Sequence, residues 1–158
     1  MKYFYFNDLF EENKTTKDFI DFINENQDEL TIFLNSGGGN SNIKQVLLDI
    51  LNENKERIML KASYFIGSNA FRLFFEFEGK KKIMDATYGM FHLTIMEVAT
   101  LENNETVESD KMTKENMLNF YFETIKFCER IGMTEEEIQK IKEGKDVYFN
   151  NKRLREFK

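Results

Sequence analysis

Apolar positions recur along this chain with two periods, one typical of strands and the other typical of helices. Short runs rich in aromatic and β-branched residues predict strands at 1–6, 31–34, 57–65, 82–86 and 90–95. Apolar residues three and four positions apart predict helices at 16–23, 43–51, 68–77 and 113–131. A capping box, Thr134 with Glu137, predicts one further helix. Because strands and helices alternate, we expect a single α/β domain over 1–158, with a mainly parallel sheet and flanking helices.

The segment from Leu30 to Asn42, LTIFLNSGGGNSN, joins a predicted strand to a predicted helix through three consecutive glycines. Glycine is needed where the backbone takes φ > 0 or closely approaches a ligand. A turn that leads into a helix can also present backbone N–H groups to an anion. The segment lacks the Gly-Lys-Ser/Thr of a P-loop and the third glycine of a dinucleotide fingerprint. A structural turn and a binding loop therefore both remain open.

Composition and charge exclude several broad classes of protein. The chain has 158 residues, of which 41% are hydrophobic, so it is long and apolar enough to bury a core. Its net charge of −6 argues against a nucleic-acid partner, because a phosphate backbone requires a basic face. The longest basic run, Lys80–Lys82, is predicted to be a solvated turn.

The cysteine count and the hydropathy of the chain exclude several kinds of site and a membrane-spanning segment. Cys128 is the only cysteine, which excludes an internal disulfide and a cysteine-cluster metal site, and no cofactor or metal is expected. No secretory signal and no apolar run near 18 residues is present, so we expect no membrane partner and a cytoplasmic location.

Several short motifs follow one another in an order that resembles the ClpP-like serine peptidases. The NSGGG at Asn35–Gly39 resembles the NSPGG turn of that family, and Asn69–Phe71 resembles its Gly-Ala-Phe just after the nucleophile. The segment Tyr88–His92, which ends in the only histidine, resembles Val-Met-Ile-His. Gly132–Thr134 and Asp146–Phe149 resemble the C-terminal region of the family. The resemblance implies a ClpP/crotonase-like fold and identifies His92 as the expected catalytic base.

The same resemblance leaves the nucleophile open. In a register without gaps, Gly67 occupies the position of the family's serine, whereas Ser68 lies one residue later and Ser63 four residues earlier. A one-residue slip on a helix turns a side chain by about 100°. Ser68 is therefore expected to act only if a local bulge or a shifted helix start brings it to face His92.

The acid and the oxyanion donors follow from the resemblance as well. Glu143 and Asp146 are the candidate acids, and Asp85 is a third option at a strand end. The backbone N–H groups of Gly38 and Gly39 are the expected oxyanion donors. Together with Asn69 they are also expected to bind extended peptide.

The resemblance implies a serine endopeptidase that acts on peptide or unfolded protein. One alternative is a non-catalytic scaffold, or a peptide-binding subunit of a ring, because of Gly67. A weaker alternative is a crotonase-like acyl-thioester enzyme. The long C-terminal helix, 113–131, carries more apolar surface than one face needs, so we expect a homo-oligomer, either a ring or a dimer. An unfoldase or a paralogous subunit is a further possible partner.

Overall fold

The computed structural model describes residues 2–93 and 110–158 of the chain. Within it the contacts divide the chain into two compact units. Unit 1 comprises Met1–Met90 and Tyr148–Arg155, and unit 2 comprises Phe91–Val147 and Glu156–Lys158. The single domain expected over 1–158 stays a prediction.

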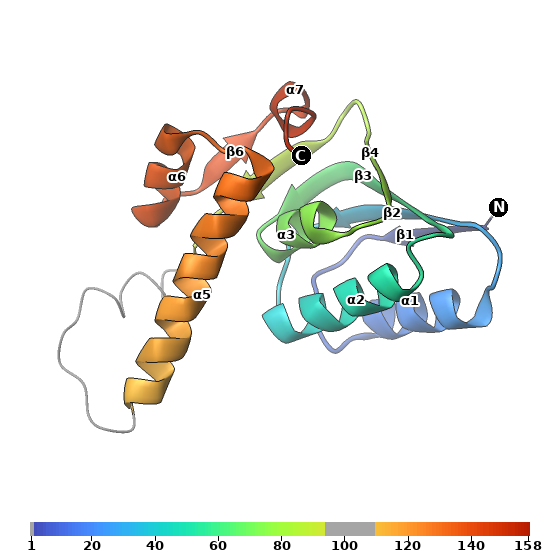
Figure 1. Cartoon of the computed structure of the whole chain (residues 1–158). Helices are drawn as coiled ribbons and strands as arrows, with labels where there is room; N and C mark the ends of the chain where they lie inside the picture. The colour runs from blue at the N-terminus through green and yellow to red at the C-terminus, as the bar shows by residue number, and fades with distance from the viewer. Residues whose placement is uncertain (1, 94–109) are drawn as a thin grey trace. The chain divides into compact units, whose positions relative to one another are not determined.

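Strands and helices alternate along the chain, as the hydrophobic pattern predicts (Figure 1). The strands are β1 (Lys2–Phe6), β2 (Leu30–Ser36), β3 (Ile58–Gly67), β4 (Lys80–Ile83), β5 (Tyr88–Phe91) and β6 (Val147–Phe149). The helices are α1 (Lys14–Glu25), α2 (Ser41–Glu53), α3 (Asn69–Glu76), α5 (Asp110–Ile131), α6 (Glu135–Lys142) and α7 (Asn151–Leu154).

The six-stranded sheet has the order β1-β2-β3-β5-β6, and β4 pairs with β3 beside this path. Every strand pair whose register is described is parallel. A parallel pair requires a crossover, and α1, α2 and α3 supply these connections between the first strands. The predicted α/β class with a mainly parallel sheet is therefore confirmed.

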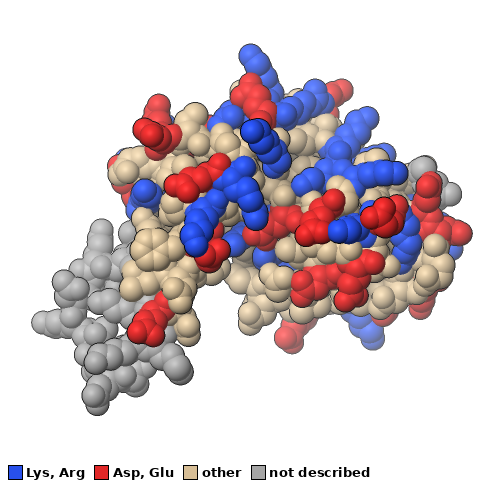
Figure 2. Space-filling model, in the orientation of Figure 1, with Lys and Arg blue, Asp and Glu red and all other residues tan. Residues whose placement is uncertain are grey.

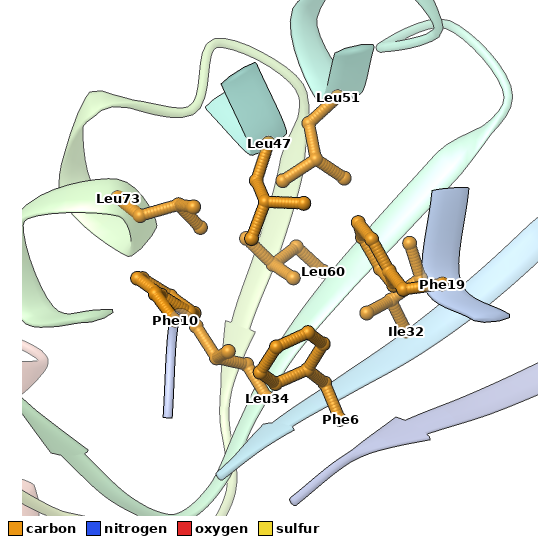
Figure 3. Close-up of a pocket in the computed structure, with 9 residues that line it drawn as sticks. All are labelled: Phe6, Phe10, Phe19, Ile32, Leu34, Leu47, Leu51, Leu60 and Leu73. Atoms are coloured by element: carbon orange, nitrogen blue, oxygen red, sulfur yellow. The ribbon is translucent and has the colours of Figure 1, made fainter. Parts of the chain in front are cut away.

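The core of unit 1 lies between the sheet and the first three helices. Alternate residues of the strands point toward the helices, where an aliphatic or aromatic side chain from each helix meets them (Figure 3). The residues that line the centre of this core, around a void of about 10 Å³, are Phe6, Phe10, Phe19, Ile32, Leu34, Leu47, Leu51, Leu60 and Leu73. Each methylene group that is removed from water in this core stabilises the unit by about 0.8 kcal/mol.

The opposite face of the first strands carries aromatic side chains that stay exposed. Tyr3 and Tyr5 on β1 are 54% and 61% exposed. The ring of Tyr5 stacks on Phe33 with 4.6 Å between centroids, and Lys61 Nζ lies 5.1 Å from the centroid of Phe33. The period of two along β1 and β2 thus separates a buried face from an open one.

A buried ion cluster joins α2 to α3. Lys44 Nζ lies 2.8 Å from Glu76 Oε2, and Arg72 Nε lies 2.7 Å from Glu76 Oε1. Burial tends to raise the pKa of Glu76, but the hydrogen bonds from Lys44 and Arg72 outweigh burial and lower it. The cluster therefore couples the two helices that follow the glycine segment and β3.

Some local predictions are confirmed and others are corrected. The capping box is present, because Thr134 Oγ1 accepts from the Glu137 N–H and Glu137 Oε2 accepts from the Thr134 N–H.

The turn predicted at Lys80–Lys82 is wrong, because these residues form β4 and pair with β3. A strand that pairs along one edge tolerates lysines, whose charged ends remain in water. Part of the predicted strand 90–95 lies outside the described residues.

Charge is mixed on the surface that Figure 2 shows. Lysine and arginine side chains are interspersed with aspartate and glutamate there, so the described residues form no continuous basic area on this face. Within the described part of the chain, no helix combines the length and the apolar content needed to cross a bilayer.

Candidate active site

Ser68 is the single residue between the end of β3 at Gly67 and the start of α3 at Asn69. Its backbone has φ 50° and ψ −120°, and it is the only non-glycine residue with positive φ in the described part of the chain. Strain of this kind amounts to about 1–3 kcal/mol and persists only where neighbouring structure imposes it. A strained serine at a sharp strand-to-helix turn is the geometry of a nucleophile elbow.

Gly67 has a different role from the one that a gapless register suggests. It lies inside β3, opposite Met90 of β5, and not in the turn. A Cβ on Gly67 would lie 2.7 Å from the ring of Phe65 and 3.2 Å from the Gly37 carbonyl oxygen, so a side chain here would require the Phe65 ring to move. Ser68, and not Gly67, therefore occupies the one-residue turn before α3.

The glycine segment packs directly against this turn. Gly38 has φ 101° and Gly39 has φ 123°, both in the region that favours glycine. A Cβ on Gly38 would lie 2.7 Å from the Gly67 carbonyl oxygen and 2.8 Å from the Asn69 nitrogen. Close backbone approach therefore requires glycine here, beside Ser68.

Backbone hydrogen bonds anchor one side of the glycine segment. The Phe10 N–H donates to the Gly38 carbonyl at 2.6 Å, and the Asn40 N–H donates to the Phe10 carbonyl at 2.8 Å. The N–H of Gly38 donates to Ser36 Oγ at 3.1 Å. Gly38, which was predicted as an oxyanion donor, therefore already uses its N–H within the protein.

Two other N–H groups next to Ser68 have no such partner. Among the residues that the structure describes, neither the Gly39 N–H nor the Asn69 N–H has an acceptor. Asn69 is the first residue of α3, where a helix leaves its N–H groups unpaired.

Ser63, the other candidate serine, lies in a β-bulge. The register of β2 and β3 shifts between Leu34 and Ser36, so β3 carries extra residues there. Ser63 Oγ donates to the Leu34 carbonyl at 3.2 Å, and Asn35 Oδ1 accepts from the Phe65 N–H at 3.0 Å. Bulges of this kind often occur beside active sites. This bulge was not predicted, although the polar Asn35 within an apolar strand is its signal in the sequence.

His92 contacts one of the candidate acids within unit 2. His92 Nδ1 lies 2.9 Å from Asp146 Oδ1, and the two side chains are 28% and 47% exposed. A carboxylate only accepts hydrogen bonds, so Nδ1 is the donor when the imidazole is neutral. Nε2 then carries the lone pair, as a general base requires.

The other two candidate acids have different partners. Lys145 Nζ lies 2.7 Å from Glu143, and this hydrogen bond lowers the pKa of Glu143. Asp85 lies 2.6 Å from Arg155 at the surface. Of the three acids, Asp146 is the one for which the structure gives a contact with the histidine.

The described residues offer no metal centre. No three histidine, cysteine, aspartate or glutamate side chains gather there as metal ligands would. Cys128 is fully buried in α5.

Comparison with solved structures identifies the fold of the chain. No protein-family model matches the sequence, and no curated protein matches it. Among solved structures, the ClpP1 N165D mutant from Listeria monocytogenes matches with a TM-score of 0.66 and 13% identity, over 97% of this chain and 85% of that chain. The ClpP protease catalytic domain from Plasmodium falciparum matches with a TM-score of 0.66 and 22% identity, over 99% of this chain and 80% of that chain. The ClpP-like fold that the motifs predict is thus confirmed: this chain has the α/β fold of ClpP protease catalytic domains.

Proposed function

We propose that this chain is a ClpP-like serine peptidase whose nucleophile is Ser68, with His92 as the base and Asp146 as the acid. The observation that carries the proposal is the backbone of Ser68, with φ 50° and ψ −120°, in a one-residue turn that packs against Gly38. The non-catalytic alternative depended on Gly67 standing at the nucleophile position. The turn instead supports Ser68 for that role.

An ordinary helix cap does not account for Ser68. A capping serine has an extended backbone, and its hydroxyl accepts a hydrogen bond from the first turn. The capping residues of α1, α2 and α6, Asn13, Asn40 and Thr134, follow this pattern. Ser68 has neither the extended backbone nor a capping hydrogen bond. The strain at this position therefore serves something other than helix stability.

The chemistry follows the general scheme of serine hydrolysis. Ser68 Oγ attacks the carbonyl carbon of the scissile peptide bond while His92 Nε2 accepts the hydroxyl proton. Asp146 orients the imidazole and stabilises its protonated form. The C–N bond then breaks, and the departing amine takes the proton from His92. Water releases the acyl group in a second, equivalent cycle.

The oxyanion that forms in each step needs fixed donors. The Gly39 N–H and the Asn69 N–H each lack an acceptor in the described structure and lie on either side of the contact between the glycine segment and the turn. One such donor contributes about 10²–10³ in rate when it is held in place. We assign the oxyanion site to this pair, whereas the Gly38 N–H keeps its bond to Ser36 Oγ.

The substrate class in this proposal is extended peptide or unfolded protein, since the solved structures with this fold are described as proteases. A homo-oligomer and a cytoplasmic location belong to the same proposal. Sedimentation tests the homo-oligomer, because a species of only 18.9 kDa at micromolar concentration would contradict it.

Fluorophosphonate labelling read by intact mass tests the chemistry. The wild-type chain should gain one adduct. Ser68→Ala and His92→Ala should each abolish the adduct. Ser63→Ala is the matched control and should label like wild type, because Ser63 lies in the bulge. An unchanged wild-type mass would favour the non-catalytic scaffold.

A further inference from the structure

The side chain of Asn69 connects the first residue of α3 to the glycine segment. Its Nδ2 donates to the Gly39 carbonyl at 2.6 Å and to Ser41 Oγ at 3.0 Å. Ser41 is the first residue of α2, so one amide group joins the starts of two helices and the segment between β2 and α2. The contact lies entirely within unit 1.

An amide suits this position for a chemical reason. Both acceptors are oxygen atoms, and a primary amide offers two N–H donors on a single nitrogen. A carboxylate of the same shape offers none, and it would face the Gly39 carbonyl with a negative charge. The interaction therefore depends on the donors and not on the size of the side chain.

The Asn69 side chain completes the restraint of the glycine segment. The backbone of Phe10 holds one side of the segment, and Ser36 Oγ holds the Gly38 N–H. Asn69 holds the Gly39 carbonyl, which belongs to the same residue as one proposed oxyanion donor. Its own backbone N–H is the other proposed donor. The side chain thus couples the positions of both.

We propose that Asn69 is a positioning residue, a latch that holds the Gly39 carbonyl and the Ser41 hydroxyl so that both oxyanion donors stay beside Ser68. The inference rests on the function proposed above for the reaction step. The latch itself is a physical contact that can be measured without the reaction. Misplacing a reacting group by about 1 Å can reduce a rate by about 10²-fold.

The experiment compares Asn69→Asp with Asn42→Asp. Asn42 is exposed at the second residue of α2, so the control makes the same chemical change in the first turn of a neighbouring helix. Both variants add a negative charge near a helix N-terminus, where the helix dipole favours it. Ser41→Ala removes one of the two acceptors and serves as a milder second variant.

Two measurements are made on each full-length variant. The first is the rate of fluorophosphonate labelling, separated into the maximal rate and the half-saturating concentration. The second is amide hydrogen exchange at Gly38 and Asn40, whose N–H groups are protected by Ser36 Oγ and the Phe10 carbonyl. Thermal unfolding is recorded in parallel.

Asn69→Asp should lower the maximal labelling rate by about 10²-fold with little change in the half-saturating concentration. Exchange at Gly38 and Asn40 should accelerate roughly tenfold, as expected when a typical hydrogen bond is lost. Asn42→Asp should change neither quantity, and Ser41→Ala should fall between. Unchanged labelling and exchange in Asn69→Asp would overturn the latch, as would an acceleration spread evenly over the whole chain.

Failure of the proposed function gives a separate result. If the wild-type chain is never labelled, Ser68 is not a nucleophile under these conditions. Exchange alone then decides the latch: local acceleration in Asn69→Asp but not in Asn42→Asp supports it, and equal exchange in both rejects it.

Discussion

The glycine segment and the Ser68 turn are held together by close backbone packing and the Asn69 side chain, whereas His92 and Asp146 meet through a hydrogen bond between two side chains. In the first region, a Cβ on Gly38 would lie within 2.8 Å of the Asn69 nitrogen. In the second, both side chains are partly exposed and 2.9 Å apart. The two regions supply different parts of the proposed chemistry, and they respond differently to substitution.

This difference determines which amino-acid substitutions each region can tolerate. Backbone packing requires particular φ values and the absence of a Cβ, so an altered residue disturbs the fold itself. A partly exposed side-chain pair can lose a partner and leave the fold intact. Substitutions in the first region should therefore reduce stability, and substitutions in the second should reduce activity alone.

Gly38→Ala should have the largest effect on stability. Its added methyl group meets the Gly67 carbonyl and the Asn69 nitrogen, at a backbone conformation with φ 101°. We expect the free energy of unfolding to fall by about 2–5 kcal/mol, measured by urea denaturation. Gly132→Ala is the matched control, because Gly132 has φ 89° but nothing within 4 Å of an added Cβ. It should lose only about 1–2 kcal/mol, from the backbone strain alone. Equal losses would show that close packing at Gly38 is unimportant.

Glu76→Gln tests the ion cluster between α2 and α3. Removing the carboxylate leaves Lys44 and Arg72 close together and poorly solvated, so we expect a loss of roughly 3 kcal/mol at neutral pH.

The pH dependence gives a second test of this cluster. The pKa of Glu76 is lowered in the folded state, so its stabilisation is present above the pKa of the unfolded chain and is lost as the pH falls through the folded pKa. Wild type and Glu76→Gln should therefore converge in stability under acidic conditions. A constant difference at all pH values would contradict this role.

Asp146→Asn should reduce activity without unfolding the chain. The amide no longer stabilises the protonated imidazole of His92, so labelling should slow by roughly 10²–10⁴-fold while the melting temperature changes little. Glu143→Gln provides the control, because Glu143 bonds to Lys145. The assignment of the acid would be reversed if Glu143→Gln slowed labelling and Asp146→Asn did not.

Asn35→Ala should have the smallest effect of the four. It leaves the Phe65 N–H in the bulge without its acceptor, and we expect a loss of about 1–2 kcal/mol in urea denaturation. Asn7→Ala removes only the exposed partner of the Asn35 amide and should be close to neutral. Similar values for the two variants would mean that the bulge is not held by Asn35.

The amino-acid sequence by itself determined the alternation of strands and helices as far as α6, the α/β class and the position of the glycine turn, but it predicted neither β6 nor α7. These features depend on local causes. Apolar periodicity sets the buried face of each element. Consecutive glycines mark a backbone conformation that residues with a Cβ rarely adopt. The capping box at Thr134 was predictable for the same reason, since its two partners are three residues apart.

Only the tertiary structure decided that Ser68 and not Gly67 stands in the strained turn, because counting residues between motifs does not reveal at which residue a strand ends and a helix begins. It also paired His92 with Asp146 in preference to Glu143, whose partner is Lys145. The contact of Asn69 with Gly39, 30 residues away in sequence, belongs to the same class. Such choices depend on register and on which distant side chains become neighbours, and no local pattern along the chain encodes either.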